Sequence, residues 1–465
     1  MYRGFFIIVV CLHTQFAFSQ YGDSVIIKRI VDETMTNSTA YENLRKLCKQ
    51  VGPRLSGSPQ FAKAVKLVTA MMKEIGADSV YLQHCMVPHW VRGDKERGQI
   101  ILSGNKKYDL HLCALGNSVG TGTKGVTASV VEVNNMEQLH KLGTNGVKGK
   151  IVFFNFPMNP TYIKTFRAYG ESGIARRSGA AIAAKYGAAG VMVRSLASNL
   201  DKYPHTGATA YNDSFPKIPA VAISTIDAAF LSKELKKARL NDKVGQGNVI
   251  KAYFRTTSKM LPDASAYNVI GEIKGSQFPE EIITVGGHLD SWDLAEGAND
   301  DGSGVVQSLE VLRTLKALGI KPKRTIRAVA FANEENGLRG AQKYLEEAKS
   351  KNEKHIFALE SDAGGFTPRG FGLDMTETQR QKILQWKEFF YPYGVYEFSI
   401  GGGGSDIGPL KTIGAALAGL SPDSQRYFDI HHAPTDVFEN VSERELKLGA
   451  AVMAALIWLV SEYGL

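Results

Sequence analysis

The sequence predicts an α/β protein, and three observations support this fold class. From about residue 266 to the end, apolar strand-like runs alternate with long helical stretches, which is the pattern of a layered α/β domain. The 465 residues, 44% of them hydrophobic, suffice for one large domain and more naturally for two. The charged fraction of 22% is ordinary, so we expect the whole chain to fold.

Residues 1–19 have the pattern of a secretory signal peptide. Arg3 supplies the positive start, residues 5–12 (FFIIVVCL) the apolar stretch, and Ala17-Phe18-Ser19 the cleavage site. The apolar stretch is too short to span a bilayer. No later stretch is judged long and apolar enough to do so. We therefore expect a protein of the secretory pathway that has no membrane span.

The formal charge of +9 is a mild excess for this length and does not imply a nucleic-acid partner. The densest basic run, Lys321-Pro322-Lys323-Arg324, is interpreted as a solvated turn. Without the signal the chain keeps three cysteines, whose spacing suggests no metal site and leaves open one disulfide plus a free thiol: Cys48, Cys85 and Cys113. Three glycosylation sequons fit an exported glycoprotein: Asn37, Asn212 and Asn440.

The chain divides into three regions with different sequence patterns. Helical patterning and short strand-like runs occupy residues 20–115. Residues 116–255 read as strands broken by glycine, with no group of catalytic residue types. Within this region, 217–223 is expected to be an edge strand because Pro219 cannot donate to a ladder. The strands predicted after 266 are Tyr267–Ile273, Ile282–Gly286, Thr325–Ala332 and Ile356–Leu359.

Polar candidates follow these strands at their carboxyl ends, where open α/β sheets bind ligands. His288 and Asp290 share one face of an extended segment, so the carboxylate could accept the spare ring N–H of the histidine. Asp300 follows in a glycine-rich turn before a helix. Taken alone, the histidine could be satisfied by a neighbouring turn, and the aspartate could belong to an N-cap loop.

The remaining candidates are two acidic segments and a histidine pair. Glu334 and Glu335 end a strongly apolar strand, where two unpaired buried carboxylates would be unfavourable. A metal relieves this conflict if one glutamate binds it and the other accepts a proton from metal-bound water. Asp362 follows the next strand, and His431-His432 follows a Gly-rich loop. An exposed acidic pair, a solvated turn and incidental histidines are the alternatives for the isolated segments.

Together the segments supply two histidines and three acids, a ligand set suited to two zinc ions per chain. Their joint occurrence at strand ends, in this order, is hard to attribute to chance. The five expected ligands are His288, Asp300, Glu335, Asp362 and His432.

This arrangement resembles the M28 family of metallopeptidases. The resemblance rests on Tyr267-Asn268-Val269-Ile270 through Gly304, on Asn333-Glu334-Glu335-Asn336-Gly337 and on the turns at Asp362 and His432. It implies a three-layer α/β/α zinc-peptidase domain with a mixed sheet, formed by 20–115 and 256–465. It also implies that residues 116–255 form an inserted, β-rich protease-associated domain.

The resemblance also implies roles for single residues. His288 and Asp362 would hold one zinc, and Glu335 and His432 the other, with Asp300 bridging. Glu334 would be the general base that activates a zinc-bound hydroxide. Asp290 would support His288. Where many family members have a tyrosine that contacts the reacting carbonyl, this chain has His431, to which we assign substrate binding.

The expected activity is that of a secreted exopeptidase, of the dipeptidase or carboxypeptidase type, acting on dipeptides or small peptides. The resemblance favours a homodimer and leaves a lysosomal location open. One alternative is an aminopeptidase of the same family. Others are an aminoacylase-like M20 hydrolase, a single-zinc glutaminyl-cyclase-like transferase and a non-enzymatic binding protein on a peptidase scaffold. Zinc content separates them: two ions per chain favours the peptidase, one the cyclase and none the binding protein.

Overall fold

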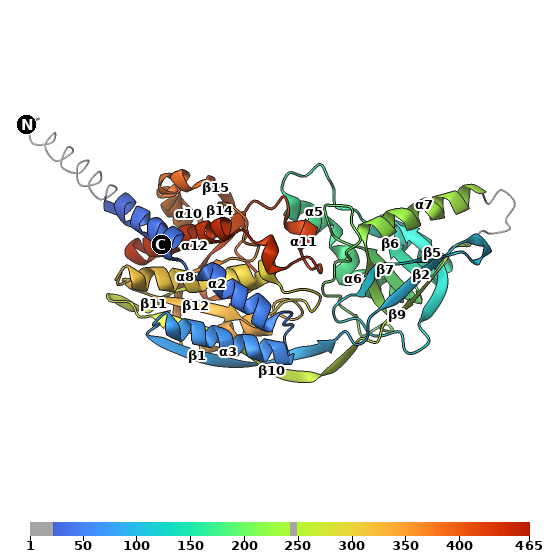
Figure 1. Ribbon diagram of the computed structural model, residues 1–465, viewed down its shortest axis with the longest axis horizontal. Helices are drawn as coiled ribbons and strands as arrows, with labels where there is room; N and C mark the ends of the chain where they lie inside the picture. The colour runs from blue at the N-terminus through green and yellow to red at the C-terminus, as the bar shows by residue number, and fades with distance from the viewer. Residues whose placement is uncertain (1–21, 242–248) are drawn as a thin grey trace, which may run out of the picture.

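Two eight-stranded sheets organise the residues that the computed structural model describes, 22–241 and 249–465 (Figure 1). The predicted signal peptide at 1–19 lies outside these residues. The first sheet has the order β1 (Ser79–Val91), β10 (Lys259–Ile273), β12 (Arg324–Phe331), β11 (Phe278–His288), β13 (Lys354–Glu360), β16 (Ala416–Pro422), β14 (Pro368–Asp374) and β15 (Glu397–Ile400). Its four central strands are parallel. Strands β1 and β10 pair antiparallel with their neighbours, and β14 pairs antiparallel with β16 but parallel with β15, so the predicted mixed sheet is confirmed.

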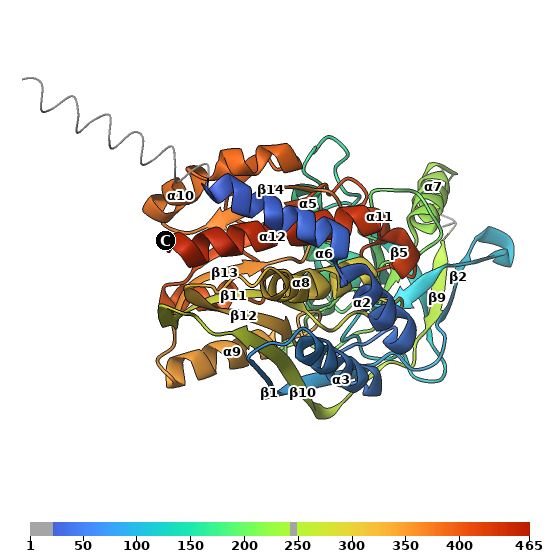
Figure 2. The same cartoon turned by 60° about the vertical axis from the view of Figure 1, so that its left-hand side comes forward.

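Helices cover both faces of the first sheet, which makes this part three layers thick (Figure 2). One face packs against α3 (Pro59–Glu74), α8 (Ser303–Ala317) and α12 (Glu443–Tyr463). The opposite face packs against α9 (Arg339–Ser350) and the 3-10 turn η6 (Gly408–Ile413). The remaining helical elements are residues 22–37, α2 (Ala40–Lys46), η1 (Leu47–Val51), η3 (Ala298–Gly302), α10 (Glu377–Leu384), η4 (Lys387–Phe389), η5 (Tyr391–Tyr393), α11 (Tyr427–Ile430) and η7 (Phe438–Asn440).

Helix α12 is long and apolar because it forms part of the core. Its length and composition would allow it to cross a membrane, so the expectation that no stretch after the signal could do so was wrong. In the fold, however, 78% of its most apolar window is buried against the first sheet and α8. A core helix that is covered on all sides is hydrophobic all round for the same reason as a membrane helix.

The second sheet belongs to a separate unit at the other end of the molecule (Figure 1). Its order is β3 (Lys107–Asp109), β2 (Arg97–Ile101), β9 (Lys251–Arg255), β5 (Val126–Val133), β6 (Ile151–Phe154), β7 (Gly190–Arg194), β8 (Ala220–Ile223) and β4 (Leu112–Ala114). On one face lie α4 (Met136–Val147) and α6 (Ile174–Lys185), and on the other lies α7 (Thr225–Asn241). Helix α5 (Thr165–Ser172) packs against α11 instead. The chain enters this unit after β1 and leaves it before β10, which are paired neighbours in the first sheet.

Two details of the second unit differ from what the sequence suggested. Its sheet already includes β2, β3 and β4, which precede residue 116. Strand β8 is not an edge strand, because β4 pairs with it on its outer side. Pro219 does not disturb this pairing, since β8 begins only at Ala220. The three cysteines Cys48, Cys85 and Cys113 are buried and free, so no disulfide forms among them.

Candidate functional site

Three neighbouring parallel strands end at one edge of the first sheet and carry most of the predicted site. Strand β11 ends at His288 itself. Strand β12 ends at Phe331, shortly before Glu334 and Glu335, and β13 ends at Glu360, shortly before Asp362. Because β12, β11 and β13 are adjacent and parallel, side chains that follow them gather at the same place.

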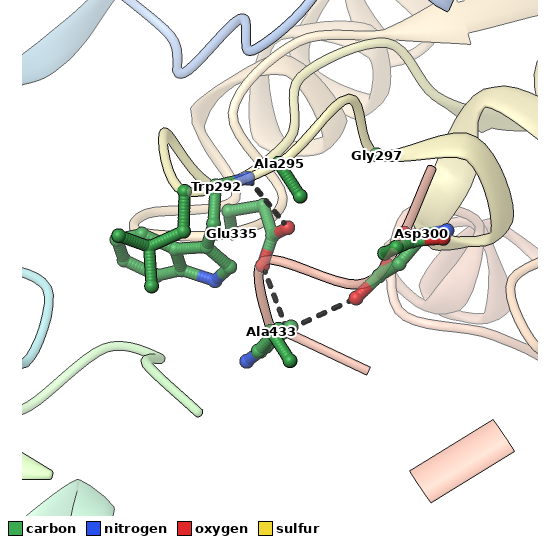
Figure 3. Close-up of a pocket in the computed structure, with 9 residues that line it drawn as sticks. Trp292, Ala295, Gly297, Asp300, Glu335 and Ala433 are labelled. Atoms are coloured by element: carbon green, nitrogen blue, oxygen red, sulfur yellow. Dashed lines mark hydrogen bonds and ion pairs between the residues drawn. The ribbon is translucent and has the colours of Figure 1, made fainter. Parts of the chain in front are cut away.

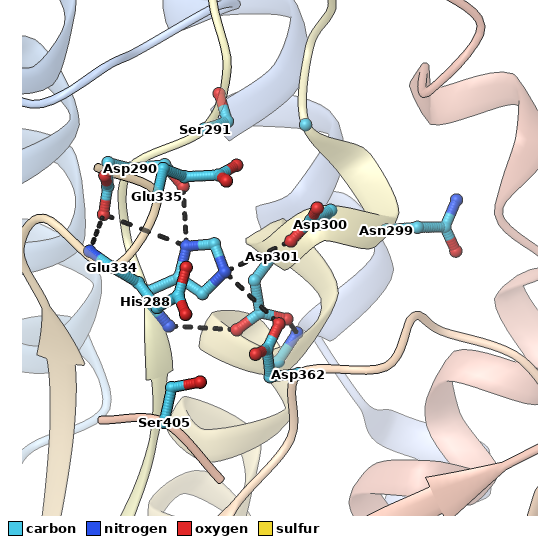
Figure 4. A network of polar contacts seen from close by, with 12 residues as sticks. His288, Asp290, Ser291, Asn299, Asp300, Asp301, Glu334, Glu335, Asp362 and Ser405 are labelled. Carbon is cyan, nitrogen blue, oxygen red and sulfur yellow. Dashed lines mark hydrogen bonds and ion pairs between the residues drawn. The ribbon is translucent and has the colours of Figure 1, made fainter. Parts of the chain in front are cut away.

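A first group of ligand atoms surrounds the ring of His288 (Figure 4). Its Nε2 atom lies 3.2 Å from Oδ1 of Asp300 and 3.3 Å from Oδ1 of Asp362. The histidine and Asp300 are buried, and the side chain of Asp362 is 23% exposed. These three residues therefore converge within hydrogen-bonding distance although they are up to 74 positions apart in sequence.

A second group faces the other oxygen of Asp300. Nε2 of His432 lies 3.0 Å from Oδ2 of Asp300 and 3.1 Å from Oε2 of Glu335. Asp300 thus presents one oxygen to His288 and Asp362 and the other to His432 and Glu335. All five residues that the sequence singled out as ligands are brought to one centre.

The donor set fits zinc. At a metal–ligand distance of 2.0–2.1 Å, neighbouring ligands of a tetrahedral zinc ion are about 3.3 Å apart, and the separations above lie near this value. Histidine nitrogens and carboxylate oxygens are the donors of mixed zinc sites. Among the described residues, three overlapping groups could hold an ion: His288, Asp300 and Glu335; His288, Asp301 and Asp362; and Asp300, His431 and His432.

The electrostatics of the centre also indicate a cation site. Burial raises the pKa of Asp362 to about 6, although the charge of His288 opposes the shift. Burial and the nearby charge of Asp300 raise the pKa of Glu335 to about 8. Carboxylates crowded together in a buried site resist ionisation, and a divalent cation removes this repulsion.

Asp290 supports His288 in a different way from the one expected. The Nδ1 atom of His288 hydrogen-bonds the backbone carbonyl of Asp290 at 3.0 Å, whereas the Asp290 carboxylate is 3.8 Å away. That carboxylate instead accepts the backbone N–H of Glu334 at 3.0 Å. Asp290 therefore links the His288 strand to the turn that carries the two glutamates (Figure 4).

The turn that presents Asp300 is held by two carboxylates whose part the sequence did not reveal. Asp436 accepts the backbone N–H groups of Asn299 at 2.8 Å and of Asp300 at 3.0 Å. Asp301 accepts the backbone N–H groups of His288 and Gly304, both at 3.0 Å. The position of Asp436, four residues after His432, was a possible indication, but only the folded chain places it beneath the Asp300 turn.

His431 lies at the centre beside His432. The two rings are stacked with centroids 3.6 Å apart, and Nε2 of His431 is 3.5 Å from Oδ2 of Asp300. Burial, together with the charge of His432, keeps the pKa of His431 well below its usual value. The His431 side chain is therefore neutral and can donate one hydrogen bond at the centre.

The second unit also reaches the centre, although its sequence showed no group of catalytic residue types. The backbone N–H of Thr206 donates to the carbonyl of His432 at 2.9 Å, and Nδ1 of His432 lies 3.2 Å from the Thr206 carbonyl. The buried Arg176, from α6, places Nη1 3.2 Å from the same ring nitrogen. Nothing local in the sequence distinguishes these two residues, because their importance depends on the docking of the two units.

A small pocket opens beside the second ligand group (Figure 3). Its lining consists of Trp292, Leu294, Ala295, Gly297, Asp300, Glu335, His432, Ala433 and Asp436. Fully buried Arg54 holds the loop that forms one wall, donating to the carbonyls of Leu289 at 2.6 Å and Gly297 at 3.0 Å. The pocket joins a mainly apolar wall to the proposed ligands, as ligand-binding sites commonly do.

Comparisons with known proteins show the family of this chain. Residues 268–457 match the model of peptidase family M28. Bovine carboxypeptidase Q is 32% identical over 447 residues, which cover 96% of this chain and 90% of the relative. Human carboxypeptidase Q is 34% identical over 91% of this chain and 85% of the relative.

Solved structures give the same result. A peptidase M28 precursor from Shewanella amazonensis superposes with a TM-score of 0.88 at 31% identity, covering 94% of this chain and 96% of that one. A zinc aminopeptidase from Bacillus subtilis, 24% identical with a TM-score of 0.61, covers 90% of this chain and 93% of that one and shares the fold. The chain therefore belongs to peptidase family M28 and is a zinc metallopeptidase.

Proposed function

We propose that this protein is a di-zinc exopeptidase that hydrolyses dipeptides or small peptides from their carboxyl-terminal side. The observation that carries this proposal is the position of Asp300, whose two oxygens face two separate histidine–carboxylate pairs. His288 and Asp362 would hold one zinc, Glu335 and His432 the other, and Asp300 would bridge them. When bound there, zinc supplies Lewis acidity that lowers the pKa of water and polarises a carbonyl.

Glu334 is the proposed general base. Its backbone is fixed by Asp290, and its carboxylate is near enough to Asp362 to contribute to the raised pKa of that group. Unlike Glu335, Glu334 is only half-buried, so its side chain remains accessible to water and substrate. It would accept the proton of the attacking water and then deliver it to the leaving amine. His431 would donate a hydrogen bond to the reacting carbonyl.

Arg176 favours recognition of a free carboxylate rather than a free ammonium. Its side chain is buried next to His432, and no carboxylate of a described residue forms an ion pair with it. A buried guanidinium without an anionic partner is unfavourable unless a ligand supplies the anion. The carboxyl terminus of a short peptide would provide this charge and would fix the scissile bond near the metals.

A panel of substrates tests this assignment. Free, amino-blocked and carboxyl-amidated dipeptides would be assayed with and without a chelator, together with the zinc content of the chain. We expect two zinc ions, activity that the chelator abolishes, and a loss of activity on amidation. A preference for amidated over amino-blocked peptides would instead support the aminopeptidase alternative.

Arg176→Gln should lower kcat/KM for free dipeptides by about 10- to 100-fold, since a hydrogen bond to a charged group contributes roughly 1.5–3 kcal/mol. The matched control is Arg177→Gln, an exposed arginine next to it on α6, which should behave as wild type. For amidated peptides, kcat/KM should be no lower in the Arg176 variant than in the wild type. If both variants retain full activity on free dipeptides, Arg176 is not the carboxylate site.

We also propose that the protein acts in the secretory pathway, outside the cell or in lysosomes. Its three sequon asparagines, Asn37, Asn212 and Asn440, are all exposed, so glycans could be attached without disturbing the fold. A shift in mass on removal of N-glycans from the protein made in eukaryotic cells tests this location.

A further inference from the structure

The net charge of the whole chain is mild, but the net charges of its two units differ strongly. Residues 97–255, which form the second unit, contain 22 Lys and Arg against 9 Asp and Glu, a net charge of +13. The rest of the chain contains 33 Lys and Arg against 37 Asp and Glu, a net charge of −4. An excess of this size on about a third of the chain produces a positive potential around that unit.

Part of this charge lies on one face of the second sheet. Ile101 on β2 pairs with Lys107 on β3 and with Lys251 on β9, so these three side chains point to the same side. At the other end of the same strand pair, Arg97 is opposite Arg255. We define the outer face as the side chains of Arg97, Gln99, Ile101, Lys107, Asp109, Thr127, Ser129, Lys251, Tyr253 and Arg255.

The outer face is not covered by the rest of the fold. The alternate residues of these strands, such as Ile100, Ala252 and Phe254, pack under α7 in a buried core. The side chains on the outer face belong to no buried core, and Arg97, Lys107 and Lys251 are exposed. A sheet normally buries one face and exposes the other, but exposed faces seldom carry so many charges of one sign.

The cations of the outer face are largely free. Arg97, Lys107 and Lys251 form no ion pair with a described residue, and Arg255 has only Asp94, at 3.7 Å. Asp109, the one acid on this face, accepts a hydrogen bond from Gln99 at 2.7 Å. Along β9 the two ends of the face are separated by four residues, or about 14 Å, and the half-buried ring of Tyr253 lies between them.

We propose that the outer face binds a linear anionic polysaccharide. Two pairs of cations, of which only Arg255 has an ion-pair partner, suit a polymer with repeated sulfate or carboxylate groups. The Tyr253 ring between the two pairs offers an apolar surface to a sugar. None of the large exposed hydrophobic side chains of the molecule lies on this face, so it has nothing to insert into a lipid bilayer. Binding would hold the peptidase at an extracellular matrix while its metal centre stays accessible.

Calorimetric titration of the full chain with a size-defined heparin oligosaccharide tests the proposal. Lys107→Glu combined with Lys251→Glu should raise Kd by about tenfold or more and flatten its dependence on salt, because fewer counterions are released on binding. The matched control is Lys63→Glu combined with Lys66→Glu, which makes the same charge change at exposed, unpaired positions of α3. It should leave Kd within about twofold of wild type.

Both double variants should retain dipeptidase activity, which shows that they are folded and keeps this test separate from the proposed catalytic function. Equal weakening by the two variants would mean that only net charge matters and would overturn the proposal. So would the absence of binding by the wild-type chain at physiological ionic strength. Tighter binding to phosphatidylserine vesicles than to the oligosaccharide would overturn the choice of partner.

Discussion

Carboxylates at the two ends of the first sheet have pKa values that are shifted in opposite directions. Just past the carboxyl ends of β12 and β13, burial raises the pKa of Glu335 to about 8 and that of Asp362 to about 6. Towards the amino end of β13, burial also acts on Glu353, but hydrogen bonds from His355 and Arg327 outweigh it and lower its pKa to about 2. At this second end one arginine compensates two acids: Arg327 binds Glu272 at 2.6 Å and Glu353 at 2.8 Å.

The contrast shows which charges are structural. Around Arg327 the protein supplies its own counter-charges, so the network is complete and stabilises the folded chain. At the metal centre the acids outnumber the cations, and a folded protein tolerates this only if something external neutralises them. The carboxyl ends of the strands, where acidic side chains outnumber cations, are therefore the candidate functional end of the sheet. Substitutions that change the charge at either end test this contrast.

The largest effect should come from Glu334→Gln, which removes the proposed proton acceptor but no metal ligand. We expect kcat for a free dipeptide to fall by about 10²- to 10⁴-fold while the zinc content is unchanged, as for the loss of a general base. The neighbouring Glu335→Gln is the control, and it should lose zinc as well as activity. Wild-type turnover by the Glu334 variant would contradict the assignment.

The next effect concerns stability without metal. Glu335 and Asp362 have raised pKa values, so the folded apoprotein holds protons that the unfolded chain has released, and its stability falls as pH rises from about 4 to 8. His288 acts in the same direction: burial lowers its pKa, but Asp362 and Asp300 raise it well above the usual value, and that stability is also lost as pH rises.

Thermal unfolding between pH 5.5 and 8 would measure this loss. We expect the free energy of unfolding of the apoprotein to fall by a few kcal/mol across the range, since each pKa unit corresponds to about 1.4 kcal/mol. Saturating zinc should abolish the decline, because metal binding displaces the protons. An apoprotein that becomes more stable with rising pH would show that the ligand carboxylates are not crowded together.

The sequence indicated the residues that converge in the candidate site better than it indicated the surroundings of that site. His288, Glu335 and Asp362 follow apolar strands at fixed short distances, so the order of parallel strands was enough to bring them together. Asp300 and His432 lie in turns, and they were included because they completed a set of two histidines and three acids suited to two zinc ions. The layered α/β class and the mixed sheet were likewise visible in the alternation of strands and helices.

Contacts between distant segments could not be read from the sequence. Arg176 and Thr206 lie in a unit with its own sheet, and only the docking of that unit against α11 brings them to His432. Ser303 is a further case: serine is typical of a helix N-cap, but its hydroxyl donates to the carbonyl of Asn299 at 2.9 Å. The tight Asp300 turn before the helix provides that acceptor.

The smallest effect should be found at the balanced end, in Glu353→Gln. The lowered pKa of Glu353 stabilises the fold above the pKa of about 4.5 that the group has when unfolded, and this stabilisation disappears as pH falls towards 2. We expect the variant to lose about 1–3 kcal/mol of unfolding free energy at pH 7.

Glu346→Gln is the control, because its carboxylate is 70% exposed and its pair with Lys343 contributes little. Chemical denaturation should show that the difference in unfolding free energy between the Glu353 variant and wild type is smaller at pH 3 than at pH 7. Dipeptide hydrolysis at pH 7 should not change. If this difference in unfolding free energy grew on acidification, Glu353 would not be ionised within its network. The contrast in pKa shifts between the two ends of the sheet would then be wrong.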